Sequence, residues 1–370
     1  GLTEQENVRL HVFIAYDLLY NNTKQTDFTR VGSEIRGRVE QIHFVDADYV
    51  NKQKEDLNHK RVLENWETDL FFGSGYASMR NAILYAAVQS HMDYLLFLDD
   101  DEYPVAVTRA HDVALWSGQR VLAKHLEYIA DADITIGYHC GYISPIPYIH
   151  FNETLTANDF QLFIEAISND IISWDKMSKL MRQGGVTYAD TNVLISNTAT
   201  EVLETNHCKF LSGSNLCLNL TDISRTIPFY NPPGARGEDT FLSTCLQERK
   251  VLRIPCYAFH NGFSTYNYLL SGVLPTQLKP ITADSKHVIT RFSNACSGWV
   301  RYKPLLLYIT QRESYRERIR DMREKLLQTL PKMSANFSTR EFSQIMDELD
   351  RYDRDVETHY QQFIDMRRIW

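Results

Sequence analysis

The sequence lacks the features that mark membrane-spanning, secreted and nucleic-acid-binding proteins. It contains no apolar run of about 18 residues, the length that spans a bilayer, and no signal peptide. Its 39 lysines and arginines are outnumbered by 47 aspartates and glutamates, which gives a formal net charge of −8. Wholesale binding to nucleic acid is therefore not expected, because proteins that do so carry an excess of positive charge.

Paired cysteines are also missing. The six cysteines are widely spaced and none forms a C-x-x-C pair, which favours reduced thiols over disulfides. Together with the missing leader, this predicts a cytoplasmic protein that at most associates with a membrane. A Golgi-type lumen would require that an N-terminal anchor had been removed.

The sequence shows no internal repeat, and its 370 residues suit one large domain with an appendage, or two domains.

Strand and helix patterns alternate through the N-terminal part. Short apolar runs rich in β-branched and aromatic residues predict strands at 8–16, 39–48 and 93–98, and an Ala- and Leu-rich segment predicts a helix at 76–90. This order is typical of an α/β fold with a mostly parallel sheet and helices on both faces. Weaker patterns predict further strands at 132–139, 186–196, 210–220 and 251–260, and helical structure within 157–184.

The C-terminal part is expected to be helical. Residues 315–330 have the charged amphipathic pattern of a helix, and a break is expected at Pro331. Ser338 and Glu341 have the spacing of a capping box that would begin a second helix. The charged face of these helices is expected to be solvated, with docking to a membrane surface or self-association as alternatives.

The stretch LLFLDDDEYP (95–104) carries three aspartates and a glutamate directly after a buried strand. Asp17, Asp46 and Asp48 also follow predicted strands, and in parallel sheets ligands collect beyond the carboxyl ends of the strands. Adjacent carboxylates are costly unless a cation compensates them, and oxygen ligands favour Mg²⁺ or Mn²⁺. The alternative is an acidic surface loop in which one aspartate caps a helix.

A second acidic pattern lies in GARGEDTFLSTCLQ (234–247). A Gly-rich loop leads into Glu238 and Asp239, and an apolar-periodic helix follows, so both carboxylates are expected near a helix N-terminus, where the helix dipole stabilises them. Simple helix capping is the alternative. The strand predicted at 251–260 ends on His260, and a lone histidine after a strand is more often structural than a metal ligand.

In this order and spacing, these features resemble the GT-A nucleotide-sugar glycosyltransferases, most closely the large inverting, family-2-like group, over about residues 8–265. Asp99-Asp100-Asp101 resembles the D-x-D motif of that fold. VDAD (45–48) resembles its VDD-x-S motif, although Ala47 replaces one aspartate, and Gly-Glu-Asp (237–239) resembles its x-E-D motif.

The resemblance implies a GT-A domain at 1–300, with a nucleotide-sugar half at about 8–105, an acceptor half at about 130–265 and a closing loop at 263–300. Residues 301–370 would form a C-terminal helical extension. Lys286, His287 and Arg291 are expected as phosphate partners in the closing loop.

The resemblance also implies a reaction, transfer of a sugar from a UDP- or GDP-linked donor to a hydroxyl of a glycan or glycoconjugate. Asp239 would be the general base, with its pKa raised by neighbouring Glu238, and a single displacement would invert the anomeric centre. The metal, Mn²⁺ or Mg²⁺, would be held by Asp99, Asp101 and His260. Contacts to the nucleotide-sugar are expected from Asp17, Asp46, Asp48, Arg80, Asp99 and Asp100.

Other functions fit less well. A nucleotidyltransferase acting on sugar phosphates would carry a Gly-rich, basic loop after the first strand, where this chain has YDLLYNNTK (16–24). A phosphatase with an aspartate nucleophile would need D-x-D at that point, and only Asp17 is present. A non-catalytic nucleotide- or sugar-binding module of the same fold remains the alternative outside enzymes.

Overall fold

The computed structural model describes residues 8–18, 23–110, 113–168, 174–182, 187–260 and 281–370. The chain forms two compact units. Unit 1 consists of Gly1–Leu95, Leu218–Tyr230 and Gln362–Trp370, and unit 2 of Leu96–Cys217 and Asn231–Gln361. Each unit is therefore assembled from segments that lie far apart in the sequence.

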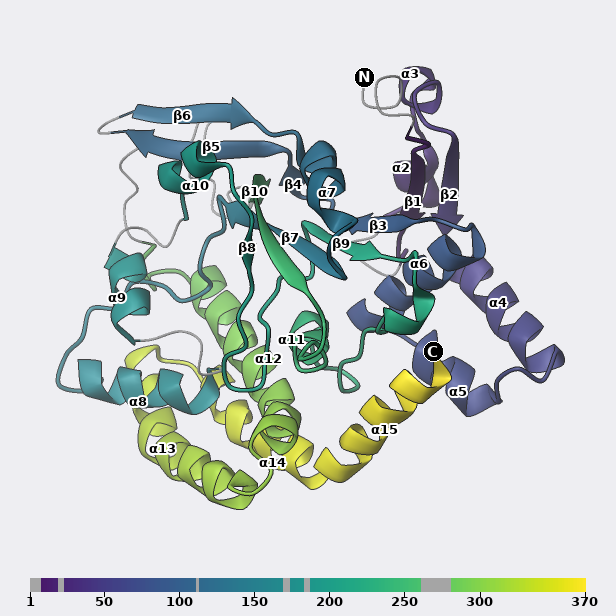
Figure 1. Cartoon of the computed structure of the whole chain (residues 1–370). Helices are drawn as coiled ribbons and strands as arrows, with labels where there is room; N and C mark the ends of the chain where they lie inside the picture. Colours follow the sequence, from purple (N-terminus) through teal and green to yellow (C-terminus); the bar gives the residue numbers. More distant parts are fainter. Residues whose placement is uncertain (1–7, 19–22, 111–112, 169–173, 183–186, 261–280) are drawn as a thin grey trace. The chain divides into compact units, whose positions relative to one another are not determined.

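Unit 1 is built on two parallel strands, β1 (His11–Ala15) and β2 (Gln41–Val45), with helix α6 (Tyr76–Gln89) packed against both (Figure 1). The first two predicted strands and the predicted helix are confirmed. However, β1 is half-buried along its whole length, not buried as the apolar run predicts. The remaining helices that begin in this unit are α2 (Gln25–Thr29), α3 (Ser33–Arg36), α4 (Ala47–His59), α5 (Asn65–Phe71) and the 3₁₀ turn η1 (Ile223–Arg225).

The last residues of the chain complete unit 1. Arg368 forms an ion pair of 2.8 Å with Glu67, and the Trp370 ring stacks on Phe71 with 5.9 Å between ring centroids. Fully buried Asn81 in α6 accepts a hydrogen bond from the Phe229 N–H (2.8 Å) and donates one to the Phe229 carbonyl (2.9 Å). The C-terminus thus belongs to the same packed body as the N-terminal strands.

The main sheet has the strand order β3-β9-β7-β10-β4, with β8 also paired to β10. Its strands are β3 (Tyr94–Phe97), β4 (Glu102–Tyr103), β7 (Ile134–Cys140), β8 (Thr200–Glu201), β9 (Leu216–Asn219) and β10 (Val251–His260). β7 runs parallel to β10, whereas β4 and β8 are antiparallel to it. The prediction of a mostly parallel sheet is therefore replaced by a mixed one, because the chain reverses after β3 and returns as β4.

A separate antiparallel hairpin, β5 (Val105–Ala110) and β6 (Val113–Gly118), follows β4 directly (Figure 1). The strand predicted at 186–196 is wrong, since the structure has helix α10 (Thr191–Ser196) there. The Asp190 carboxylate accepts a hydrogen bond of 2.8 Å from the Asn192 N–H and begins the helix. A local cap of this kind overrides the strand preference of the β-branched residues.

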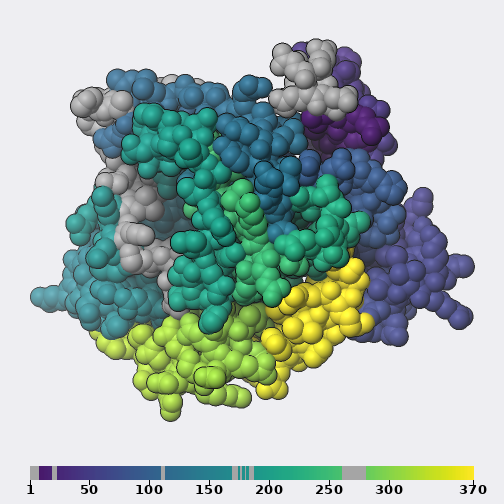
Figure 2. Space-filling model, viewed as in Figure 1, coloured from purple at the N-terminus to yellow at the C-terminus, as the bar shows by residue number. Residues whose placement is uncertain are grey.

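Helix α7 packs on β7 and β10, and helices α8, α12, α13 and α14 pack on one another. Figure 2 shows α13 and α14, in yellow-green, beside the teal α8 and α9 on one face of this unit. The bounds are α7 (Val121–Ile129), α8 (Ala157–Ile167), α9 (Trp174–Arg182), α11 (Glu238–Ser243), α12 (Lys286–Thr310), α13 (Tyr315–Asn336), η3 (Glu341–Ser343), α14 (Gln344–Arg354) and α15 (Val356–Ile369). None of the described helices is long and apolar enough to cross a bilayer.

The C-terminal helices depart from the sequence prediction in three ways. The predicted boundary between residues 300 and 301 falls inside α12. The break predicted at Pro331 is wrong, because α13 continues through this proline while burying Leu330 and Met333. Packing of α13 on α8 outweighs the lost backbone hydrogen bond. The predicted capping box is absent, since Ser338 has a positive φ of 50° and the short η3 turn follows.

A buried polar network ties α7 to the sheet. The His125 Nδ1 lies 2.7 Å from the Thr135 hydroxyl, its Nε2 lies 3.0 Å from the side-chain oxygen Oδ1 of Asn215, and all three residues are fully buried. The Asn215 amide donates to the Tyr138 carbonyl at 3.0 Å and fills the space beside Gly137, where a Cβ would meet it at 2.0 Å. Burial lowers the pKa of His125 to about 4, so the ring is neutral in the folded protein.

We expect the stability of the protein to fall as the pH drops from about 6.5 to 4. In this range the unfolded chain takes up a proton on His125 and the folded one does not, which costs about 3 kcal/mol at 1.36 kcal/mol per pKa unit. Urea unfolding across this pH range measures it. His125→Gln should flatten the slope by about that amount, whereas His207→Gln, at a side chain 70% exposed, should leave it unchanged. If the unfolding free energies of the two variants depend on pH in the same way, the lowered pKa assigned to His125 is wrong.

Candidate functional site

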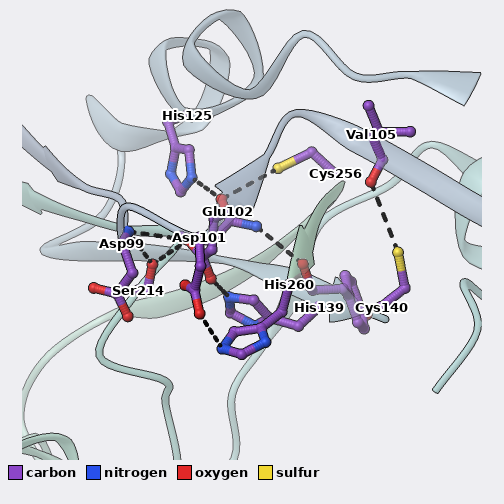
Figure 3. A network of polar contacts seen from close by, with 12 residues as sticks. Asp99, Asp101, Glu102, Val105, His125, His139, Cys140, Ser214, Cys256 and His260 are labelled. Atoms are coloured by element: carbon purple, nitrogen blue, oxygen red, sulfur yellow. Dashed lines mark hydrogen bonds and ion pairs between the residues drawn. The ribbon is translucent and has the colours of Figure 1, made fainter. Parts of the chain in front are cut away.

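The acidic stretch forms a tight turn between β3 and β4. The Glu102 N–H donates to the Asp99 carbonyl at 3.2 Å, which closes the turn. The Asp99 N–H in turn donates to the Ser214 hydroxyl at 3.1 Å and to a Glu102 carboxylate oxygen at 3.3 Å. Ser214 lies next to Asn215, so the turn is connected to the buried network beneath it (Figure 3).

The fourth carboxylate of the cluster points into the protein. The Glu102 side chain is only 2% exposed, and its Oε1 lies 2.7 Å from the Nε2 of His139 at the end of β7. This contact is an ion pair by distance, although the ring nitrogen is too poorly aligned for a regular hydrogen bond. The other oxygen, Oε2, accepts a short hydrogen bond from Ser214. Burial alone would raise the pKa of Glu102, but His139, Ser214 and the Asp99 amide outweigh it and lower the pKa.

The third aspartate points the other way, towards the end of β10. Asp101 Oδ2 lies 3.2 Å from His260 Nε2, with the two side chains 46% and 29% exposed. Antiparallel pairing of β4 with β10 sets His260 opposite Glu102, which brings Asp101 and the histidine together. Of the expected metal ligands, the structure thus joins Asp101 and His260.

The remaining aspartates of the turn lie apart from this pair. Figure 3 shows Asp101 between Asp99 and His260, and both Asp99 and Asp100 are exposed. Within the part of the chain that the structure describes, no group of three or more His, Cys, Asp or Glu residues is arranged to hold a metal ion. Any ion at this turn would therefore need oxygen ligands from a substrate or from water besides Asp101 and His260.

The Gly-Glu-Asp motif begins helix α11, as predicted. Gly237 precedes the helix with a φ of +98°, a conformation that strongly favours glycine, and a Cβ there would lie 3.2 Å from the Tyr302 ring. Glu238 is 8% exposed, and Asp239 is half-buried. Burial, with smaller contributions from Asp239 and Tyr142, raises the pKa of Tyr302, so this tyrosine stays a neutral hydroxyl.

Tyr142 packs beside the pair of Asp101 and His260. Its ring meets the His260 ring edge to face, with 5.7 Å between centroids. Asp101, His260 and Tyr142 therefore lie together, and they belong to the same unit as the helix that begins at Glu238.

The expected nucleotide contacts of the N-terminal half belong to unit 1. Asp46 is the N-cap of α4, where it accepts a hydrogen bond of 2.9 Å from the Tyr49 N–H and another of 2.9 Å from the buried Tyr16 hydroxyl. Asp48 lies in the first turn of the same helix, and both Asp48 and Asp17 are exposed. Their predicted contact with a nucleotide stays a prediction.

Arg80 also belongs to unit 1 and lies over the Phe229 ring, 5.8 Å from its centroid. A guanidinium in that position packs on an aromatic face and can still turn its N–H groups towards a ligand. The segment predicted to close over the donor lies in part outside the described residues, at 263–280. Its last part, from Lys286 on, is the start of helix α12.

Comparison with protein-family models, with curated proteins and with solved structures finds no match to this chain.

Three residues of the site have no counterpart in the sequence motifs. His139 ends a predicted strand, as His260 does, but nothing in the sequence pairs it with Glu102. Ser214 lies within the strand predicted at 210–220, and nothing in the sequence marks it as a partner of Glu102. Tyr142 is one of 21 tyrosines, and its contact with His260 depends on tertiary structure.

Replacing Ser214 by alanine should destabilise the acidic turn. The change removes a hydrogen-bond donor from a buried carboxylate and an acceptor from the Asp99 N–H, so we expect a loss of about 1–3 kcal/mol of unfolding free energy. Denaturant unfolding at pH 7 measures this. Ser343→Ala is the matched control, because that exposed hydroxyl donates only to a nearby carbonyl. A Ser214→Ala protein as stable as the control variant would refute the role of the hydroxyl.

Proposed function

We propose that the chain is a metal-dependent glycosyltransferase that moves a sugar from a nucleoside diphosphate-sugar to an acceptor hydroxyl. The observation that carries the proposal is the approach of Asp101 to His260 at 3.2 Å, on the turn that also buries Glu102. Two ligands at right angles around one small divalent ion are separated by about 3 Å, since each lies about 2.1 Å from the ion. The pair therefore has the spacing of adjacent ligands.

The chemistry of these two side chains fits Mn²⁺ or Mg²⁺. Such ions are commonly held by few protein ligands, with the other positions filled by water and phosphate oxygens, so a two-residue site suits a diphosphate substrate. When bound, the ion would supply positive charge next to the departing diphosphate. Glu102 supports the site differently, because its buried carboxylate contacts His139 and Ser214 and holds the turn in place.

Asp239 is proposed as the general base. The acceptor hydroxyl attacks the anomeric carbon, the bond from that carbon to the diphosphate oxygen breaks, and the hydroxyl proton passes to the Asp239 carboxylate. Attack opposite the leaving group inverts the anomeric centre. Glu238, its neighbour in the first turn of α11, is largely buried. Asp99 and Asp100, exposed on the turn, are left to contact the donor.

The metal-dependent reaction gives the first test. With Mn²⁺ and no acceptor, the protein should slowly hydrolyse one of a panel of UDP- and GDP-sugars, as measured by nucleotide release. Asp101→Ala should lower the rate about 100-fold or more, because it removes charge stabilisation of the leaving group. Exposed Asp347→Asn is the matched control and should keep the full rate. If no donor is bound or hydrolysed with Mn²⁺, the proposed function is wrong.

The base gives a second test. Asp239→Asn should reduce transfer to a sugar acceptor by about 10²–10⁴-fold, the usual contribution of a general base. Calorimetry should find unchanged binding of the nucleoside diphosphate with Mn²⁺, because Asp239 contacts the acceptor and not the donor. Equal loss of donor binding and of transfer would assign Asp239 to the donor site instead.

A further inference from the structure

Three exposed aromatic side chains lie around the end of β10, where the proposed site is found. Tyr103 is 50% exposed, Trp116 is 44% exposed and Tyr142 is 42% exposed. They come from three different segments of unit 2, namely strand β4, strand β6 and the loop after β7. Large aromatic rings that stay in contact with water, close together and next to a site, indicate a surface that binds a ligand.

Tyr103 and Trp116 both lie against Phe259, the residue before His260. Tyr103 is the partner of Phe259 in the antiparallel pairing of β4 with β10, so the two side chains share a face of the sheet with about 5 Å between their Cβ atoms. The Trp116 ring meets the Phe259 ring with 5.2 Å between centroids. Phe259 is buried in the core cluster that also contains Val107 of β5, a strand that packs beside β10 (Figure 1). The two exposed rings therefore have a buried support.

Tyr142 lies on the other side of the strand end. Its ring meets the His260 ring, and consecutive residues of a strand point to opposite faces, so Tyr142 lies on the face of His260 and Trp116 on the face of Phe259. Gly141 allows the loop to approach this closely, since a Cβ there would lie 2.4 Å from the Phe259 ring. The proposed metal ligand at the end of β10 thus has an exposed aromatic ring on each side.

We propose that Tyr103, Trp116 and Tyr142 bind the sugar rings of an oligosaccharide acceptor. The C–H groups on one face of a sugar ring pack on an aromatic face, while the sugar hydroxyls remain hydrogen-bonded to water and to polar side chains. This assignment rests on the glycosyltransferase function proposed above and names its acceptor as a chain of sugars.

The charge beside these rings favours a sugar over a lipid surface. Asp99 and Asp100 are exposed on the turn that leads into Tyr103. Negative charge this close to the rings would repel the anionic headgroups of a membrane. An uncharged ligand rich in hydroxyls is compatible with it, because carboxylates accept hydrogen bonds from hydroxyl groups.

The positions of the rings along the chain favour several sugars over one. Trp116 is paired with Val107 in the hairpin, and Val107 lies four residues after Tyr103. The chain stays extended between them, since the Pro104 carbonyl accepts a hydrogen bond of 2.8 Å from the Gln119 N–H and continues the hairpin ladder. Four extended residues span about 13 Å. Rings placed this far apart along one strand suit successive sugars of one chain.

The test is the binding of uncharged oligosaccharides without donor or metal, so that it does not depend on catalysis. The probes are cellohexaose, maltohexaose, mannohexaose, xylohexaose and chitohexaose, each with its monosaccharide, measured by ligand-observed NMR and calorimetry. We expect at least one hexasaccharide to bind about tenfold or more tightly than its monosaccharide, because it reaches several rings at once. Trp116→Ala and Tyr103→Ala should each weaken that binding about tenfold, and Trp116→Phe, which keeps an aromatic ring, should retain most of it.

Trp66→Ala is the matched control, because this tryptophan is 47% exposed but belongs to unit 1. Its variant should bind the hexasaccharides as the unaltered protein does. The proposal is overturned if no hexasaccharide binds, or if Trp66→Ala weakens binding as much as Trp116→Ala. It is also overturned if the protein binds vesicles of phosphatidylcholine and phosphatidylglycerol, and Trp116→Ala abolishes that binding while leaving sugar binding unchanged.

Nucleotide binding separates this proposal from the proposed function. The unaltered protein is titrated with UDP and with GDP in the presence of Mn²⁺ by calorimetry. If a nucleotide binds and no hexasaccharide does, the role of the aromatic rings is wrong and the transferase stands. If a hexasaccharide binds through Trp116 and no nucleotide does, the transferase is wrong and the rings still form a sugar-binding surface.

Discussion

The ion pair between Glu102 and His139 is the contact on which the acidic turn depends. Four consecutive carboxylates repel one another, and the chain relieves this by burying one of them against a histidine and a serine. The turn then has one fixed side chain and three that face outwards. Because β4 starts at the buried glutamate and pairs with the end of β10, the same contact determines which aspartate meets His260. The burial of Glu102 and the register of β4 on β10 together determine that Asp101 meets His260.

The sequence predicts much of this architecture because its strongest signals are local. The strands around β1, β2, β3, β7 and β10 and helix α6 are visible as apolar periodicity. The secondary-structure predictions fail where a contact between residues far apart in the sequence, or a single helix cap, determines the local structure. At Pro331 the packing of α13 on α8 maintains the helix, and at Asp190 one side-chain hydrogen bond turns a strand-like run into a helix.

The candidate site likewise contains some residues that the sequence motifs indicate and others that only the tertiary structure brings in. Asp101 and His260 lie together at the ends of strands of one sheet, and their expected role as metal ligands stays a prediction. The inward orientation of Glu102 could not be predicted, because nothing in DDDE indicates which of the four carboxylates will be buried. His139, Ser214 and Tyr142 are ordinary residues in the sequence and become part of the site only through strand neighbours and loop packing.

The composition of unit 1 bears on how the chain folds during synthesis. Its strands β1 and β2 and helix α6 are made before Phe229, which packs on Asn81. Arg368 and Trp370 are made later still. Domains generally fold as they leave the ribosome, N-terminal parts first. Here β1, β2 and α6 would have to wait, with Phe71 and Asn81 uncovered, until Phe229 and the last turn of α15 have been made.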